Sequence, residues 1–316
     1  MSTLAPPAHL ESGYATCAGL TKRHGTTYYW GARLLPAAQR RHVFAVYALA
    51  RLADDLVDEA AGQEPHERAA ALDAFERRFR AAVDEGTSDD PVLAAVAASV
   101  RECRIPDEAF TRFFDAMRRD LTCGEYETWA DLLGYMDGSA AVIGEMMLPV
   151  LRPDTEATQP ARALGLAFQL TNFLRDVAED LDRGRVYVPQ EDLRRFGADP
   201  WARTATPEWK ALMAFEIARN RDLYREADDG LAALPSGSRR CVATARVLYA
   251  RILERIEAVD YDVFSGRARV PTPTKASLAA RMLVARDPER IVRRDRAARS
   301  LPVTSPLTTD PEEQTT

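Results

Sequence analysis

The sequence predicts an all-α fold in one folded domain, and three observations support this. Apolar residues recur at intervals of three and four, as in Val43, Val46, Tyr47 and Ala50, which is the period of a helix with one buried face. Alternating β-branched runs are scarce, and the best, at 185–188, stops at Pro189. No repeat of 30 to 45 residues is visible, which argues against a helical solenoid.

The helices follow one another between segments rich in proline and glycine, which end helices. Most stretches between these breaks are 15 to 30 residues long. We predict a disordered N-terminal segment over 1–13, the folded domain over 14–300, and a disordered C-terminal tail over 301–316, because both ends are polar and rich in proline or threonine. The expected breaks are at 35–36, 62–65, 86–91, 105–106, 152–153, 184–189, 235–237 and 271–273.

Composition excludes several classes of protein. With 42 basic and 48 acidic residues the net charge is −6, whereas a nucleic-acid binder normally carries a basic excess. The four cysteines lie far apart, so neither a disulfide scaffold nor a structural zinc site is expected. The most apolar long stretch, 132–151, is interrupted by Asp137 and Glu145 and falls short of the ~20 apolar residues that span a bilayer. We expect a cytoplasmic protein.

A first polar stripe lies on a helix that otherwise looks buried. At 100° per residue, Tyr47, Arg51, Asp54 and Asp58 fall within an arc of roughly 60°. Leucine, valine and alanine occupy most of the remaining circumference. Such a helix belongs in the core, so its polar stripe is expected to face something other than bulk water.

A second stripe repeats the pattern more than a hundred residues later. Gln169, Asn172, Asp176 and Asp180 share an arc of roughly 80°, and leucine, phenylalanine and valine surround them. An Asp-Asp-x-x-Asp run alone is commonly a solvated face. Two such stripes in one helical chain are harder to explain as solvated faces, because buried carboxylates are costly and repel one another. Carboxylate oxygens without thiols select Mg²⁺ or Mn²⁺, which often also binds substrate phosphates.

With these stripes in view, the chain resembles the phytoene/squalene synthases, the head-to-head branch of the class I trans-isoprenyl diphosphate synthases. The resemblance extends over about 14–275 and is most specific over 169–189. It is carried by HGTTYY at 24–29, LLP at 34–36, YALARLADDLVDE at 47–59, YMDGSAAVIG at 135–144, QLTNFLRDVAED at 169–180, GRVYVP at 184–189 and YDVF at 261–264.

The resemblance implies a single helical bundle around a deep central cavity, with the two aspartate motifs facing each other across it. Mg²⁺ (or Mn²⁺) would be held by Asp54, Asp58, Asn172, Asp176 and Asp180. Tyr47 and Asn172 would join these aspartates as catalytic residues. The residues that would contact the prenyl diphosphates are Arg51, Gln169, Arg175, Arg185, Tyr187, Tyr28, Thr27 and Tyr249.

The sequence departs from the family pattern at three places. Gly25 replaces a serine of the usual Ser-Lys-Ser-Phe flap, Ala50 replaces a frequent cysteine, and residues 139–141 read Ser-Ala-Ala where Val-Ala-Gly is usual. No metal ligand is removed. The small residues between Gly138 and Gly144 have two open explanations, namely room for a prenyl chain or close packing between helices.

The function implied is head-to-head condensation of two prenyl diphosphates in carotenoid biosynthesis. We favour two geranylgeranyl diphosphates giving phytoene through a cyclopropyl diphosphate, without NADPH. The alternative is dehydrosqualene or squalene synthesis from farnesyl diphosphate. A terpene cyclase would show an Asn/Ser/Glu metal triad, and a chain-elongation synthase a second DDxxD motif. An inactive helical scaffold is the alternative of a different class, disfavoured because all four motif aspartates are present.

Few partners are expected beyond the prenyl diphosphate substrates. We predict no nucleic acid and a monomer or weak dimer. The stretch 286–299 carries six arginines against three acids; it is expected to be a solvated helix, with contact to anionic lipid as the minority alternative. A hydrocarbon product must leave into a membrane, so peripheral membrane contact is also expected.

Overall fold

The computed structural model describes residues 8–58 and 64–297. Its elements are helices separated by short loops, and an isolated β-bridge joins Glu125 and Val186. In chain order they are α1 (Ala8–His24), α2 (Thr26–Ala32), α3 (Ala37–Asp58), α4 (Pro65–Glu85), α5 (Pro91–Cys103), α6 (Asp107–Asp120), α7 (Trp129–Met136), the π-helical turn η1 (Asp137–Ala141), α8 (Val142–Leu151), α9 (Thr158–Asp182), α10 (Gln190–Phe196), the 3₁₀ turn η2 (Pro200–Ala202), α11 (Pro207–Asp228), the 3₁₀ turn η3 (Leu231–Ala233), α12 (Ser236–Ala258), α13 (Thr272–Val284) and α14 (Pro288–Ala297).

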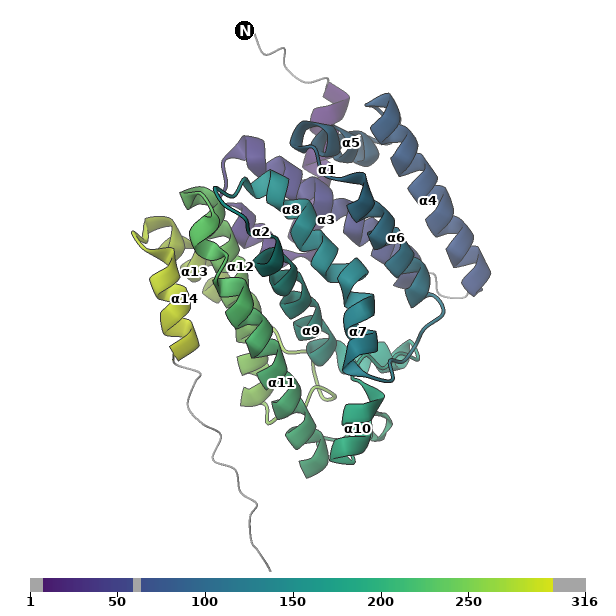
Figure 1. Cartoon of the computed structure of the whole chain (residues 1–316), viewed down its shortest axis with the longest axis vertical. Coiled ribbons are helices and arrows are strands. Elements are labelled where there is room, and N and C mark those ends of the chain that lie inside the picture. Colours follow the sequence, from purple (N-terminus) through teal and green to yellow (C-terminus); the bar gives the residue numbers. More distant parts are fainter. Residues whose placement is uncertain (1–7, 59–63, 298–316) are drawn as a thin grey trace, which may run out of the picture.

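The helix α9 runs through the middle of the bundle, with α8 on one side and α11 and α12 on the other (Figure 1). Its apolar side chains Leu170, Leu174 and Val177 are buried, as expected for a helix surrounded by other helices. The helix α3 lies behind α8, and α1, α4, α5 and α6 complete that side. The all-α prediction is confirmed.

Local sequence signals explain where helices stop and start. Gly86 ends α4 with a positive φ of 76°, a conformation that glycine adopts without strain. Asp90 then begins α5, because its side chain accepts hydrogen bonds from the backbone N–H groups of Val92 and Leu93. The break predicted at 86–91 is therefore confirmed.

Two expectations need correction. Part of the segment predicted to be disordered over 1–13 is helical, since α1 begins at Ala8; residues 1–7 and the tail over 301–316 lie outside the described residues, as does Glu59 of the first aspartate motif. A break at 121–128 was also missed. Here the chain leaves α6 and runs beside the loop after α9, and the N–H of Val186 donates to the carbonyl oxygen of Gly124 at 2.7 Å.

The C-terminal helices α13 and α14 pack on α12 at the outer edge of the bundle (Figure 1). None of the helices within the described ranges is long and apolar enough to cross a membrane.

Candidate functional site

The last two turns of α3 carry three carboxylates, two of which form ion pairs with Arg51. The Nη1 atom of Arg51 lies 3.1 Å from Oδ2 of Asp54, and its guanidinium also forms an ion pair with Asp55. Asp58 pairs instead with Arg185, from the loop that follows α9. The first predicted stripe thus forms one charged cluster, and arginines from two elements balance part of its charge.

The second cluster lies on α9 and is held by two different arginines. The side chain of Arg175 donates two hydrogen bonds to Asp176, at 2.6 and 2.5 Å. Arg267, from the loop between α12 and α13, donates two more at 2.8 Å each. Among the described residues, the ion-pair contact of Asp180, one turn further along α9, is a long one of 3.6 Å with Arg183. The two aspartates of the motif therefore have different surroundings.

Arg185 joins the two halves of the site. Besides Asp58 it approaches Asp120, at the end of α6, at 3.4 Å. Asp120 is buried and also accepts a hydrogen bond of 2.8 Å from the hydroxyl of Tyr187. The loop after α9 is thereby fixed to α3 and α6 through two residues, Arg185 and Tyr187, and α9 is held opposite α3.

The pKa values show that negative charge is in excess between the clusters. Burial raises the pKa of Asp54 to about 7, and the charge of Asp58 adds to this rise more than Arg51 offsets it. Burial also raises the pKa of Asp180 to about 8, with further contributions from Asp176 and Asp58. Because Asp58 on α3 acts on Asp180 on α9, the two clusters share one electrostatic environment.

Asp176 behaves in the opposite way. Burial alone would raise its pKa, but the hydrogen bonds and charge of Arg175, followed by those of Arg267, hold the pKa below its usual range. Asp176 is therefore ionised and paired. In Asp180, four residues further along α9, burial and the nearby carboxylates instead destabilise the ionised form.

Packed aromatic rings connect the first charged cluster with the apolar pocket, since Tyr47 lies near Arg51 and Asp54 while Tyr28 lines the pocket. Tyr28 packs against the rings of Tyr47, Phe168 and Tyr249 at centroid distances of 5.6, 5.6 and 5.1 Å. A side chain at position 25 would collide with the Tyr47 ring, because a Cβ built on Gly25 lies 2.5 Å from a ring carbon. Glycine at position 25, in place of the usual serine, therefore leaves room for the Tyr47 ring.

Asn172 has an unsatisfied atom in the same region. Its Oδ1 is buried and has no hydrogen-bond partner within the described part of the chain, while its side chain also interacts with the hydroxyl of Tyr249. A buried acceptor without a partner is rare in folded proteins and calls for a ligand or a water. It lies on α9 one turn before Asp176.

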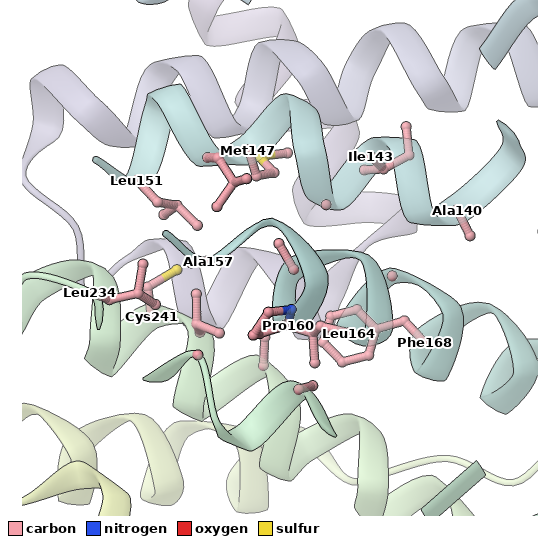
Figure 2. Close-up of a pocket in the computed structure, with 18 of the residues that line it drawn as sticks. Ala140, Ile143, Met147, Leu151, Ala157, Pro160, Leu164, Phe168, Leu234 and Cys241 are labelled. Atoms are coloured by element: carbon pink, nitrogen blue, oxygen red, sulfur yellow. The ribbon is translucent and has the colours of Figure 1, made fainter. Parts of the chain in front are cut away.

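An apolar pocket runs along α9 away from the carboxylates (Figure 2). Most of its walls come from η1, α8, α9, η3 and α12, with single residues from α2, α3 and α11, and its space, including the part open to solvent, is about 1100 Å³. Gln169 and Ser139 supply polar atoms toward one end. Figure 2 shows Leu151, Leu234 and Cys241 together at the other end.

The small residues around the pocket serve mainly to let helices approach. A Cβ on Gly144 would lie 2.1 Å from the carbonyl oxygen of Ala161, and one on Gly165 would lie 2.3 Å from that of Ala140. A Cβ on Gly138 would meet the carbonyl oxygen of Arg112 at 2.6 Å. Close packing therefore explains these glycines, of which Gly144 and Gly165 also line the pocket.

The residues fit a hard divalent cation that is shared with a second anionic ligand. Within residues 8–58 and 64–297, no group of three or more His, Cys, Asp or Glu side chains is arranged to hold a metal ion by itself. The donors are nevertheless of the right kind. Burial and neighbouring carboxylates disfavour the ionised forms of Asp54 and Asp180, and Asn172 Oδ1 lacks a hydrogen-bond partner among the described residues. A hard divalent cation binds oxygen donors, and its charge would balance the negative charge of these carboxylates.

The remaining predicted residues lie close to this region. Thr27 is buried on α2 beside Tyr28, and Gln169 lines the pocket. Sequence reasoning missed Asp120 and Arg267, and it also missed Lys275, whose Nζ donates to Thr26 Oγ1 at 2.5 Å. Asp120 lies on α6, Arg267 in the loop between α12 and α13, and Lys275 on α13. None of them belongs to a periodic polar stripe that a sequence pattern would reveal.

Comparison with known proteins gives a consistent result. The family described as squalene/phytoene synthase matches residues 21–274. A 15-cis-phytoene synthase of Synechococcus elongatus is 36% identical over 293 residues, which cover 87% of this chain and 94% of that protein. A chloroplastic phytoene synthase of Daucus carota is 38% identical, over 83% of this chain and 67% of that protein.

Solved structures of similar fold agree with the sequence relatives. A dehydrosqualene synthase in complex with a ligand aligns with a TM-score of 0.79 at 28% identity, over 86% of this chain and 96% of the other. A squalene synthase from Alicyclobacillus acidocaldarius aligns with a TM-score of 0.72 at 33% identity, over 81% and 97% of the two chains.

Proposed function

The chain belongs to the squalene/phytoene synthase family of prenyltransferases, and from this premise we propose that it condenses two geranylgeranyl diphosphates head to head to give phytoene. The observation that carries the proposal is the position of the two aspartate clusters. They meet through Arg185 at one end of an apolar pocket that follows α9. Diphosphates would bind at the clusters and prenyl chains in the pocket.

The length of the pocket favours a C20 chain. Its lining residues extend from Gln169 on α9 back to Ala157, the residue just before this helix, a distance of about 18 Å at 1.5 Å per residue. An extended carbon chain with bonds near 1.5 Å advances roughly 1.25 Å per bond, so a geranylgeranyl backbone spans roughly 19 Å and a farnesyl backbone roughly 14 Å. Dehydrosqualene or squalene formation from farnesyl diphosphate remains the second candidate, supported by the two structural neighbours.

The family uses a divalent metal to bind diphosphate, and we propose Mg²⁺ or Mn²⁺ at Asp54, Asp58, Asn172, Asp176 and Asp180. When bound, the metal supplies positive charge that stabilises the departing diphosphate. Arg185 and Arg267, which pair with Asp58 and Asp176, are also proposed to contact the diphosphates, because guanidinium groups pair well with phosphate oxygens.

Other cations surround the same space. Burial lowers the pKa of Lys275, and the positive charges of Arg175 and Arg269 lower it further. Lys275, Arg175 and Arg269 together favour an anion among them, so Lys275 and Arg175 are proposed to bind a diphosphate. Arg51, in the cluster on α3, is proposed to bind a diphosphate as well. Tyr187 fixes the neighbouring loop through its hydrogen bond to Asp120.

The aromatic residues have a separate role. Loss of diphosphate leaves an allylic cation that water would convert to an alcohol, so the reacting carbon must be kept dry. The rings of Tyr28, Tyr47, Phe168 and Tyr249 pack together near the first charged cluster and the pocket, and we propose that they line the reacting space, because aromatic faces stabilise cations. Burial raises the pKa of Tyr28 and Tyr47, so both remain neutral and add no charge.

The test is the identity of the hydrocarbon. Purified full-length protein is incubated with Mg²⁺ and either geranylgeranyl or farnesyl diphosphate, without NADPH, and the extract is analysed by mass spectrometry. We expect phytoene from the C20 substrate at the higher kcat/KM. A C30 product formed at higher kcat/KM would establish the second candidate, and no hydrocarbon from either substrate would refute both. We also propose a monomer or weak dimer that touches membranes peripherally.

A further inference from the structure

The last two residues of α13 have the most exposed large apolar side chains of the described residues. Leu283 is 60% and Val284 is 79% exposed, more than Trp201 at 52% and Val259 at 51%, the remaining exposed large hydrophobic residues. The side chain before them, Met282, is fully buried. The end of α13 is therefore held in the core by Met282, while its last two side chains are exposed to solvent. The helix α13 lies at the edge of the bundle (Figure 1).

The residues that flank this pair in the sequence are rich in arginine. Residues 281–294, which we call the α13–α14 corner, carry five arginines against Asp287 and Glu289, a net charge of +3 in a chain whose net charge is −6. Both acids are already paired, Asp287 with Arg293 at 2.8 Å and Glu289 with Arg293 at 3.3 Å and Arg239 at 3.2 Å. Four exposed arginines of the corner have no ion-pair partner among the described residues, namely Arg281, Arg286, Arg290 and Arg294.

The corner is connected to the far end of the apolar pocket. Arg240 on α12 donates hydrogen bonds to the carbonyl oxygens of Met282 and Ala285, at 3.2 and 3.1 Å. These bonds hold the end of α13 in place. The next residue of α12, Cys241, lines the pocket at the end farthest from the carboxylates (Figure 2).

We propose that the α13–α14 corner docks the protein on an anionic lipid surface, with Leu283 and Val284 entering the apolar layer and the four arginines contacting lipid phosphates. An exposed apolar pair, with exposed and unpaired arginines before and after it in the sequence, complements an anionic bilayer in both respects. The proposal rests on the proposed function, because a lipid substrate and a hydrocarbon product give the docking its use. The docked orientation brings the far end of the pocket next to the bilayer.

The test measures vesicle binding without substrate, so that it is independent of catalysis. Full-length protein is mixed with vesicles of phosphatidylcholine and phosphatidylglycerol, or of phosphatidylcholine alone, and bound protein is measured by flotation. Variants are the pair Leu283→Ser with Val284→Ser, and the pair Arg286→Gln with Arg290→Gln. Matched controls away from the corner are Trp201→Ser on η2 and Arg77→Gln, an exposed residue on α4.

We expect binding to the anionic vesicles that weakens with added salt. Each lost arginine should weaken binding by about fivefold, and the apolar pair by at least about tenfold. The controls should bind like the unchanged protein. Equal binding by all variants, or equal binding to both kinds of vesicle, would overturn the proposal.

Two further measurements complete the test. The molar mass in solution should be the same for the unchanged protein and for the apolar pair; a dimer that the pair dissociates would show that a second copy covers the corner, and would overturn the proposal. Condensation of detergent-dispersed substrate should be unchanged in the corner variants. If the unchanged protein makes no hydrocarbon but still binds vesicles through the corner, the proposed function fails and the docking surface stands.

Discussion

Replacing Asp180 with asparagine should stabilise the metal-free protein while abolishing turnover. Burial raises the pKa of Asp180 from 3.8 to about 8, and the charges of Asp176 and Asp58 contribute to the rise. A carboxyl group whose pKa is higher in the folded than in the unfolded state favours folding most at low pH. The free energy of unfolding then falls as the pH rises from about 4 to about 8. Asparagine has nearly the same shape and carries no charge, so it removes this loss.

The magnitude follows from the two pKa values. At 1.36 kcal/mol for each pKa unit the full difference corresponds to roughly 5–6 kcal/mol, which is an upper limit. Because the carboxylates are coupled and partly reached by solvent, and the effective dielectric constant of such sites is closer to 20 than to 4, we expect a gain of about 1–3 kcal/mol at pH 8. The gain should vanish below about pH 4, where the carboxyl group is protonated in both states.

Asp176→Asn is the matched comparison, four residues earlier on the same helix. Arg175 and Arg267 hold the pKa of Asp176 below its usual range despite its burial, so its charge contributes stability that is present at neutral pH and lost as the pH falls through this pKa. Removing it leaves both arginines without their carboxylate and should lower stability by about 1–3 kcal/mol at neutral pH. Thermal melts in chelator over a pH series measure both effects. Shifts of the same sign in the two variants would refute the electrostatic reasoning.

Three further predictions concern catalysis, packing and selectivity. Arg51→Ala should block even the first pyrophosphate release, because it loses charge-assisted contacts that contribute about 1.5–3 kcal/mol each. Asn172→Ala should instead slow the second half-reaction, so that the cyclopropyl diphosphate or its alcohol accumulates and is detected by mass spectrometry in single-turnover assays. Equal loss of both steps in both variants would contradict this division. Gly165→Ala should lower the free energy of unfolding by at least about 2 kcal/mol, since its Cβ would lie 2.3 Å from a backbone oxygen of η1, and an unchanged denaturation midpoint would count against the close packing. Ala157→Phe should fill the far end of the pocket and lower kcat/KM for the C20 substrate at least about tenfold more than for the C15 substrate; an unchanged ratio would place the chain ends elsewhere.

Much of the site could be predicted from helical periodicity. The stripes ending at Asp58 and Asp180 each lie on one helix, so the sequence alone brings their members together once 3.6 residues per turn is assumed. Their meeting could not be predicted in this way, because it depends on how α3 and α9 are placed by the rest of the bundle. Only the resemblance to a family suggested that the stripes face each other.

The residues that sequence reasoning missed come from single positions on other elements. Asp120 follows two arginines at the end of α6 and looks like an ordinary surface charge in the sequence, although folding buries it beneath Arg185 and Tyr187. Arg267 lies in a loop with no periodic pattern and reaches Asp176 across 91 residues of chain. The glycines were ambiguous for the same reason, since a close approach such as that of Gly144 to Ala161 is a property of the packed helices.

The central claim is that the two aspartate clusters together condense two prenyl diphosphates, and the ratio of products tests it most directly. Purified protein is given geranylgeranyl diphosphate and Mg²⁺ without NADPH, and pyrophosphate and hydrocarbon are quantified in the same reaction. We expect pyrophosphate and phytoene in a ratio of two to one, and no release of either without the metal. Pyrophosphate released with a C20 alcohol and no C40 hydrocarbon would show simple hydrolysis and would contradict the account.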